Sequence, residues 1–185
     1  MTMVLETQRL ILRPWTEEDA PELYRYASDP RVGPIAGWPV HTSVEHSREI
    51  IREVFSAPET YAVVLKETGL PVGSVGILRG EGANAPLGER EAEIGYWIGV
   101  PYWGRGLIPE AVDKLLERCF HGLNCTAVWC DHADGNENSR RVMEKCGFRY
   151  HHTVEGEWND LIGASRTVHY TRLTREEWEA KASGV

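Results

Sequence analysis

The chain has 185 residues, 42% of them hydrophobic and 26% charged, so it is long enough for one well-buried core and short for two. We expect a single domain over residues 1–185, with its core at about 7–179. The formal net charge of −8 argues against nonspecific nucleic-acid binding and suits cationic acceptors. No apolar run approaches the roughly 20 residues that span a bilayer, and the N-terminus lacks a charged segment followed by an apolar stretch, so we expect a cytoplasmic protein with no membrane partner.

The first part of the chain predicts one strand and two helices. The strand covers Leu5–Arg13 and is stopped by Pro14, after which Thr16 caps a helix whose first turn is acidic. Prolines and glycines around Trp38 exclude regular structure between residues 31 and 42, and predict either a loop over a pocket or a plain connector. Ser43 then caps a second helix, roughly Val44–Phe55, with Ile50, Ile51 and Val54 as its buried set.

The rest of the chain alternates short β-rich runs with helical patterns, in the overall order βααβββαβαββα. The predicted strands are Thr60–Lys66, Val72–Arg79, Glu93–Val100, Ala127–Asp131, Phe148–Val154 and Arg166–Leu173. Three more helices are predicted. The first begins at Leu107, the second covers Glu137–Cys146 with Gly147 as its C-terminal cap, and the third follows a capping box at Thr174.

Cysteine and histidine spacing predicts no metal site. The four cysteines are Cys119, Cys125, Cys130 and Cys146, and no two of them form a C-x-x-C pair, so we expect reduced, mostly buried thiols. Cys130 and His132 could be two ligands of a metal, but no second pair has matching spacing.

The stretch from Glu93 to Phe120 carries the strongest local signal. An extended apolar run passes through Gly104 and Gly106 into an amphipathic helix, with Pro109 in its first turn. A strand that enters a helix through Gly-x-Gly exposes backbone N–H groups beside the positive end of the helix dipole, an arrangement that binds phosphate. A tight turn without a ligand explains this motif alone equally well. The run lacks the Gly-Lys-Ser/Thr of a P-loop and the third glycine of a dinucleotide fingerprint.

Five motifs in order resemble the GNAT N-acetyltransferases, most closely the RimJ/RimL-type enzymes that acetylate ribosomal-protein N-termini. They are TQRLILRPW, AEIGYWIG, WGRGLIPEAV, NENSRRVMEKCGF and VHYTRLTREEW. The resemblance implies an α/β (α+β) fold of GNAT type: a mixed, mostly antiparallel sheet flanked by helices. Its parallel fourth and fifth strands splay apart and leave a V-shaped cleft for acetyl-coenzyme A (acetyl-CoA), with no metal.

The resemblance also assigns the coenzyme contacts. The pantetheine arm is expected to pair with backbone groups of Trp97, Ile98 and Gly99, and to form a hydrogen bond with Asn136. The pyrophosphate is expected on the amides of Trp103, Gly104, Arg105, Gly106 and Leu107. The sequence departs from the family motif at Pro101, so any side-chain contact made from that position is absent. Arg105, Arg140 and Arg141 are candidates for the outer phosphates, with plain surface charge as the alternative.

Acetyl transfer to an amine needs a base, a donor that polarises the carbonyl, and a proton source for the thiolate. By resemblance, Glu93 is the expected base, Glu157 its rival, and the Ile98 N–H the oxyanion donor. Many relatives place a tyrosine proton donor where this chain has Met143, so Ser139 is the expected donor here. Asn136 and Ser139 could instead simply cap the helix.

An α-amino group, with a pKa of about 7.7 to 8.0, is roughly a tenth neutral at pH 7, whereas a lysine amine is far less so. Chemistry and resemblance both favour the N-terminus of a protein or peptide as acceptor. One alternative is that the acceptor is a small amine or an antibiotic. The other is that the chain is a catalytically silent acyl-CoA-binding protein on the same fold. Trp38 and Trp158 are expected to line the acceptor pocket, or else to pack in the core or a dimer contact, since relatives are often homodimers.

Overall fold

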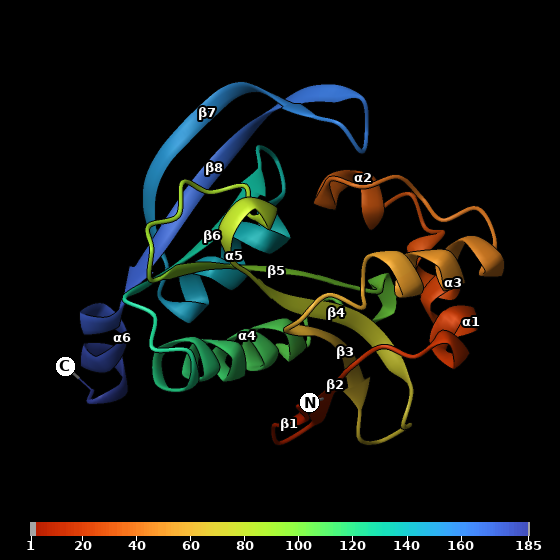
Figure 1. The fold of residues 1–185 in the computed structure, drawn as a ribbon, viewed down its shortest axis with the longest axis horizontal. Coiled ribbons are helices and arrows are strands. Elements are labelled where there is room, and N and C mark those ends of the chain that lie inside the picture. The colour runs from red at the N-terminus through yellow and green to blue at the C-terminus, as the bar shows by residue number, and fades with distance from the viewer. Residues whose placement is uncertain (1–2, 185) are drawn as a thin grey trace.

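The computed structural model describes residues 3–184 and contains one eight-stranded sheet in the order β1-β2-β3-β4-β5-β6-β8-β7 (Figure 1). All neighbouring strands are antiparallel except β5 and β6, which are parallel. The strands are β1 Leu5–Glu6, β2 Leu10–Arg13, β3 Thr60–Leu65, β4 Pro71–Leu78, β5 Glu91–Ile98, β6 Ala127–Ala133, β7 Arg149–Asn159 and β8 Ala164–Thr174. The helices are α1 Ala20–Ala27, α2 Gly33–Ala36, α3 Val44–Glu53, α4 Leu107–Glu117, α5 Glu137–Cys146 and α6 Arg175–Ala182.

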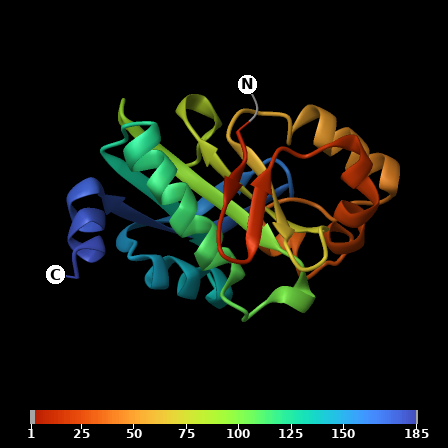
Figure 2. The same ribbon diagram turned by 90° about the horizontal axis from the view of Figure 1, so that it is seen from below.

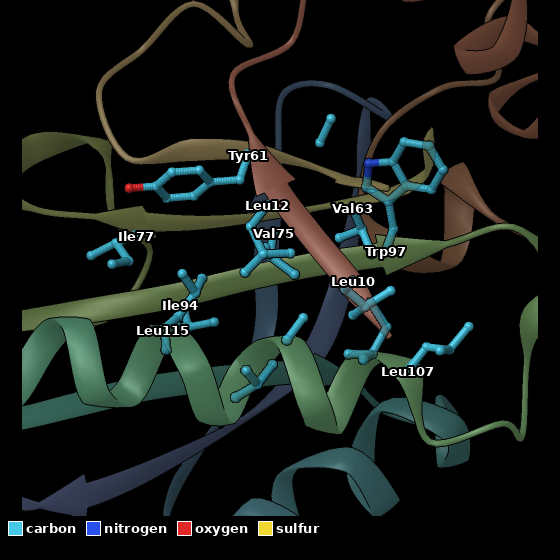
Figure 3. Packing of buried hydrophobic residues seen from close by; sticks show 14 of the residues in the cluster. Leu10, Leu12, Tyr61, Val63, Val75, Ile77, Ile94, Trp97, Leu107 and Leu115 are labelled. Carbon is cyan, nitrogen blue, oxygen red and sulfur yellow. The ribbon is translucent and has the colours of Figure 1, made fainter. Parts of the chain in front are cut away.

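Helix α4 runs along one side of the sheet and packs on β2, β4 and β5, while α1 packs on β4 and on α3 (Figures 1 and 2). Side chains alternate along β5 because successive residues of a strand point to opposite faces. Figure 3 shows Ile94 directed toward Leu115 of α4, with Trp97 on the other side of the strand. The long β7–β8 hairpin forms the end of the sheet beyond β6 and arches above α5 in Figure 1.

The central feature of the sheet is the separation of β5 from β6. Their parallel pairing is limited to three residue pairs, from Glu91 opposite Ala127 to Glu93 opposite Trp129. Beyond these pairs β5 continues to Ile98 and β6 to Ala133, so the two strands diverge. The splayed parallel pair implied by the family resemblance is therefore confirmed, and these strands are β5 and β6 in the numbering of the structure.

Several predicted elements have different bounds in the structure. The strand expected over Leu5–Arg13 is two antiparallel strands, because the chain turns where the Thr7 N–H donates to the Leu10 carbonyl. The segment between residues 31 and 42 contains the four-residue helix α2, which Gly37 ends at a φ of 106°. Val54 was expected in the core, but it follows the end of α3 and is 52% exposed.

The predicted end of one helix and the predicted start of another are confirmed. Helix α5 has the predicted bounds and ends at Gly147 with a left-handed φ of 95°. The capping box at Thr174 is present at the start of α6. All four cysteines are free and buried. Within residues 3–184, no helix combines the length and apolarity that crossing a bilayer requires.

The contact between β4 and β5 next to the divergence generates a stability prediction. A methyl group at Gly73 would collide with the Trp97 carbonyl oxygen and lie 2.9 Å from Cα of Ile98. Because both obstacles are backbone atoms, Gly73→Ala should lower the free energy of unfolding by about 1–3 kcal/mol in urea denaturation. Gly76→Ala on the same strand is the matched control: its nearest neighbour lies at 3.5 Å, and its effect should stay within about 1 kcal/mol. Equal effects of the two variants would contradict the assigned packing.

Candidate active site

A cleft of about 550 Å³ opens where β5 and β6 diverge. Its walls come from the diverging halves of these strands, the loop into α4, the first turns of α5, and α2 with Arg166 of β8. Glu93, Ile98, Asn136 and Ser139 all line it. The structure therefore brings together most of the residues that the sequence assigned to one site.

The glycine corner at one end of the cleft has the backbone form that phosphate binding needs. Gly104 and Gly106 have φ values of 74° and 75°, the left-handed region that glycine adopts at little cost. Within the described chain, the N–H groups of residues 104–107 have no hydrogen-bond partner, and α4 starts directly behind them. The Trp103 N–H is different, because it donates to the Val100 carbonyl at 3.1 Å. The free amides thus begin at Gly104, one residue later than expected.

Two cations of α5 face this corner. Arg141 and Lys145 both line the cleft, and the Lys145 ammonium lies 3.6 Å from the position that a Cβ at Gly106 would occupy. Arg140, which was considered for the outer phosphates, instead pairs with Glu137 and Glu144 at 2.6 Å each. Sequence reasoning missed Lys145, although its i,i+4 spacing from Arg141 could have placed both on one helix face.

The other arginine considered for this role, Arg105, lies outside the cleft lining. Its guanidinium carbon sits 5.2 Å from the centre of the Tyr102 ring, and its carbonyl accepts a hydrogen bond from Arg9 at 2.9 Å. The side chain of Arg105 is exposed. The backbone N–H of Arg105, and not its guanidinium, is therefore its candidate group for phosphate binding.

The edge of β5 presents the Ile98 amide toward the gap at the divergence. Antiparallel pairs alternate between hydrogen-bonded and non-hydrogen-bonded residues. Gly99 donates its N–H to the Val72 carbonyl at 2.9 Å, while Ile98 lies opposite Gly73 in the next pair. The Ile98 N–H therefore points away from β4 and toward the gap. Of the three residues expected to pair with a pantetheine arm, Trp97 and Gly99 direct their N–H groups to β4, and Ile98 keeps its N–H free.

Glu93 sits at the base of the cleft and is 2% exposed. Its carboxylate oxygens accept hydrogen bonds from the N–H groups of Asn84 and Ala85, each at 3.0 Å. Burial, followed by the nearby negative charge of Asp131, raises the pKa of Glu93 to about 8. A carboxyl with such a pKa is a stronger base than an ordinary glutamate and exchanges its proton near physiological pH.

Asp131 is a component of the site that sequence reasoning missed. It follows Trp129 by two residues on β6, and Trp129 lies opposite Glu93, so the two carboxyls share one face of the sheet. Burial and the negative charge of Glu157 raise the pKa of Asp131. The signal was available in the strand register, but register cannot be read from a single sequence before pairing is known.

Glu157, the rival base, lies on β7 opposite Arg166 and outside the cleft lining. Its carboxylate accepts a hydrogen bond from the Tyr170 hydroxyl. Arg166 lines the cleft and donates from Nη1 to the Ile35 carbonyl of α2 at 3.3 Å, while its Nε is buried without a partner among the described residues. Glu157 therefore influences the cleft only through its charge on Asp131, whereas Glu93 lines the cleft directly.

Ser139 stands in the first turn of α5 on the opposite wall. Its N–H bonds to Oδ1 of Asn136 at 3.3 Å, so the capping role foreseen for Asn136 is real. The Ser139 hydroxyl is 2.7 Å from the hydroxyl of Tyr96, a contact that was not foreseen. Met143, at the position where relatives carry a tyrosine, is 1% exposed and packs in the core.

Neither tryptophan expected in the acceptor pocket lines the cleft. Trp38 packs edge-on against Trp97, with ring centres 5.5 Å apart, and belongs to the partly buried rim of the core. Trp158 is 61% exposed on the β7–β8 hairpin and bonds to Asp160 at 2.5 Å. The part of the cleft next to Arg166 is instead lined by Val32, Ile35 and Ala36. In residues 3–184 no group of three or more His, Cys, Asp and Glu side chains is placed to hold a metal ion.

Comparison with known proteins gives a consistent result. A family model described as an acetyltransferase (GNAT) domain matches residues 9–149. Protein p20 of Bacillus licheniformis, named as an uncharacterized N-acetyltransferase, is 30% identical over 150 residues, or 78% of this chain and 82% of p20. YdaF of Bacillus subtilis, provisionally named a ribosomal N-acetyltransferase, is 38% identical over 95 residues, or 50% of each chain. The solved structure of Mycobacterium smegmatis RimJ in complex with CoA-disulfide matches with a TM-score of 0.72 at 22% identity, over 99% of this chain and 94% of that one.

The two carboxyls at the base of the cleft can be tested without any assay of activity. Following the side-chain carbons of Glu93 by NMR through a pH titration should show a pKa far above 4.5. Asp131→Asn removes the like charge and should lower the pKa of Glu93, whereas Asp134→Asn, which removes an exposed charge on the same strand's continuation, should leave it unchanged. An ordinary pKa of Glu93 in the unaltered protein would refute this electrostatic description.

Proposed function

The chain belongs to the GNAT acetyltransferase family and is an acetyl-CoA-dependent N-acetyltransferase, and from this premise we propose that it acetylates the N-terminal α-amine of a protein or peptide. The observation that carries the proposal is the pairing of a buried, high-pKa carboxyl with a free backbone N–H on one strand, opposite a serine hydroxyl. YdaF, whose name points to a ribosomal acceptor, supports the choice of a protein N-terminus.

The cleft residues fit the coenzyme in this proposal. The N–H groups of residues 104–107, at the positive end of α4, would hold the pyrophosphate. Arg141 and Lys145 would offset the charge of the phosphates, and the free N–H of Ile98 would bind along the pantetheine arm or at the acyl oxygen. Acetyl-CoA supplies the activated acetyl group as a thioester.

In this proposal transfer proceeds by direct attack of the amine within a ternary complex. Glu93 takes the proton of the attacking amine through water, because its side chain is almost fully buried. The Ile98 N–H stabilises the negative charge that develops on the acyl oxygen. The C–S bond breaks as the C–N bond forms, and the Ser139 hydroxyl gives its proton to the departing sulfur. Glu93 returns its proton to solvent, and Ser139 regains one from solvent.

Two physical arguments favour an α-amine acceptor. The pKa of Glu93, at about 8, lies close to the pKa of an α-amino group, about 7.7 to 8.0, so little free energy separates the two proton positions. A lysine amine, with a pKa of about 10.4, would lose its proton to this base much less readily. In addition, three acidic residues, Glu93, Asp131 and Glu157, lie on this side against the single cation Arg166, and those of them that are ionised attract a cationic acceptor.

The acceptor can be identified with synthetic peptides. Free-thiol release from acetyl-CoA should occur with peptides that have a free α-amine and should be absent with N-terminally blocked peptides that retain a lysine. Mass spectrometry should locate the acetyl group on the N-terminus. Release only with polyamines or aminoglycosides would favour the small-amine alternative, and tight coenzyme binding with no release on any acceptor would favour a silent binding protein.

The role of Glu93 is tested in the same assay. Glu93→Gln should lower kcat by about 10² to 10⁴. The activity of the unaltered protein, as kcat/KM, should rise as pH increases through about 8, because only the ionised carboxylate acts as a base. Glu91→Gln is the matched control, since Glu91 lies on the same face of β5 but pairs with Arg172 outside the cleft. A full-rate Glu93→Gln enzyme would exclude Glu93 as the base.

The phosphate corner generates a separate binding prediction. Arg141→Ala and Lys145→Ala should each weaken binding of coenzyme A about 3- to 10-fold in calorimetry, with a smaller loss at high salt because exposed charges are screened. Arg140→Ala removes the same charge from the same helix but from a side chain already paired with Glu137 and Glu144. It should bind coenzyme A normally, and an equal loss in all three variants would show that only net charge matters.

A further inference from the structure

We propose that Tyr96 is a positioning residue whose hydroxyl holds the Ser139 hydroxyl in the orientation that donates to the departing sulfur. The inference rests on the proposed function and adds a residue to which neither the sequence motifs nor the comparisons assign a role. Tyr96 lies on β5 beyond Glu93, the last residue of β5 that pairs with β6. Its side chain can therefore cross the gap left by β6 and reach α5.

The contact itself is specific. The Tyr96 hydroxyl lies 2.7 Å from Oγ of Ser139 and 3.1 Å from the Ser139 carbonyl oxygen. The Ser139 N–H is already engaged with Asn136 at 3.3 Å. Ser139 is thus held at three atoms: its N by the N-terminal cap of its own helix, and its Oγ and carbonyl oxygen by the Tyr96 side chain from β5. Such double anchoring fixes a hydroxyl that would otherwise rotate freely about its Cα–Cβ bond.

The Tyr96 hydroxyl decides which hydrogen bonds the Ser139 hydroxyl accepts and donates. A serine hydroxyl has one proton to give and two lone pairs to accept with. The Ser139 carbonyl lies inside α5, where it accepts the backbone bond of the helix, so it does not need the tyrosine. When Tyr96 donates to Oγ, the serine accepts that bond and keeps its own proton free for the cleft. Without the phenol, Oγ loses its donor and the hydroxyl can turn toward backbone acceptors in its own helix.

Tyr96 is suited to donate rather than to act as the proton source. Burial raises the pKa of Tyr96 well above its ordinary value, so the phenol keeps its proton throughout the working pH range. Transfer of that proton would leave a phenolate in a buried site beside Cys130 and Cys146. The proton that reaches sulfur is therefore the serine proton, while the O–H bond of Tyr96 stays intact and stabilises the charge left on Oγ until solvent restores its proton.

Strand β5 thus contributes one residue from each of its two faces to the cleft. Glu93 and Tyr96 are three residues apart on β5, so they project to opposite faces. Glu93 serves the side from which the amine attacks, and Tyr96 serves the side from which sulfur leaves.

A double-mutant cycle tests the assignment. Tyr96→Phe removes only the hydroxyl, and should lower kcat about tenfold while the KM for acetyl-CoA changes by less than about twofold. Ser139→Ala should lower kcat about 10²-fold. The double variant should be no slower than Ser139→Ala, because Tyr96 acts only through Ser139. Tyr61→Phe is the matched control: Tyr61 is a buried tyrosine on β3 that bonds to Glu59 away from the cleft, and its variant should retain full kcat.

A second readout does not depend on turnover. Crystal structures of Tyr96→Phe and of the unaltered protein, each soaked with coenzyme A, should show the Ser139 side chain in different rotamers. If the unaltered protein released no thiol with any acceptor, the proposed function would fail, yet the Ser139 rotamer would still decide whether Tyr96 positions it. An unchanged rotamer, a defect confined to KM, or kcat losses that multiply in the double variant would each overturn the proposal.

Discussion

The site depends on one constraint: two adjacent parallel strands stop pairing after three residue pairs, yet both continue. Buried backbone N–H and C=O groups are costly without partners, so a sheet that opens in its middle must satisfy them from elsewhere. Gly99, directly after β5, bonds to Val72 of β4, and the N–H of the preceding Ile98 is left facing the gap. Tyr96 and Ser139 fill part of this gap with side chains. The remaining space is the cleft, and an extended ligand can complete the pairing that β6 abandons.

The cleft separates charge along its length. Glu93 and Asp131 occupy one end, and Arg141 and Lys145 face the glycine corner at the other. The acidic end costs stability: because the folded-state pKa of Glu93 is raised from 4.5 to about 8, the folded protein retains a proton that the unfolded chain releases. The contribution of Glu93 to stability is therefore present below pH 4.5 and falls as pH rises through about 8. A buried carboxyl whose pKa is raised at the expense of stability is typical of functional sites.

Local sequence signals predicted what depends on local structure. The bounds of α5, its Asn136 cap and its Gly147 terminus, and the capping box at Thr174 follow from residue types within one turn of the chain. The residues that were missed depend on long-range register. Asp131 faces Glu93 only because β6 pairs with β5 at Trp129, and Tyr96 meets Ser139 only because α5 covers the gap. For Trp38 the sequence left a pocket role and core packing open, and it could not decide between them because the packing of Trp38 against Trp97 joins distant segments.

The central claim is that the divergence leaves the Ile98 N–H free for the coenzyme, and amide hydrogen exchange of that one residue tests it most directly. In the free protein, the Ile98 amide should exchange much faster than the Gly99 amide, which bonds to Val72. Saturating coenzyme A should slow exchange at Ile98 and at residues 104–107 and leave Gly99 unchanged. An Ile98 amide that is already protected in the free protein, or one whose exchange coenzyme A does not alter, would contradict the account.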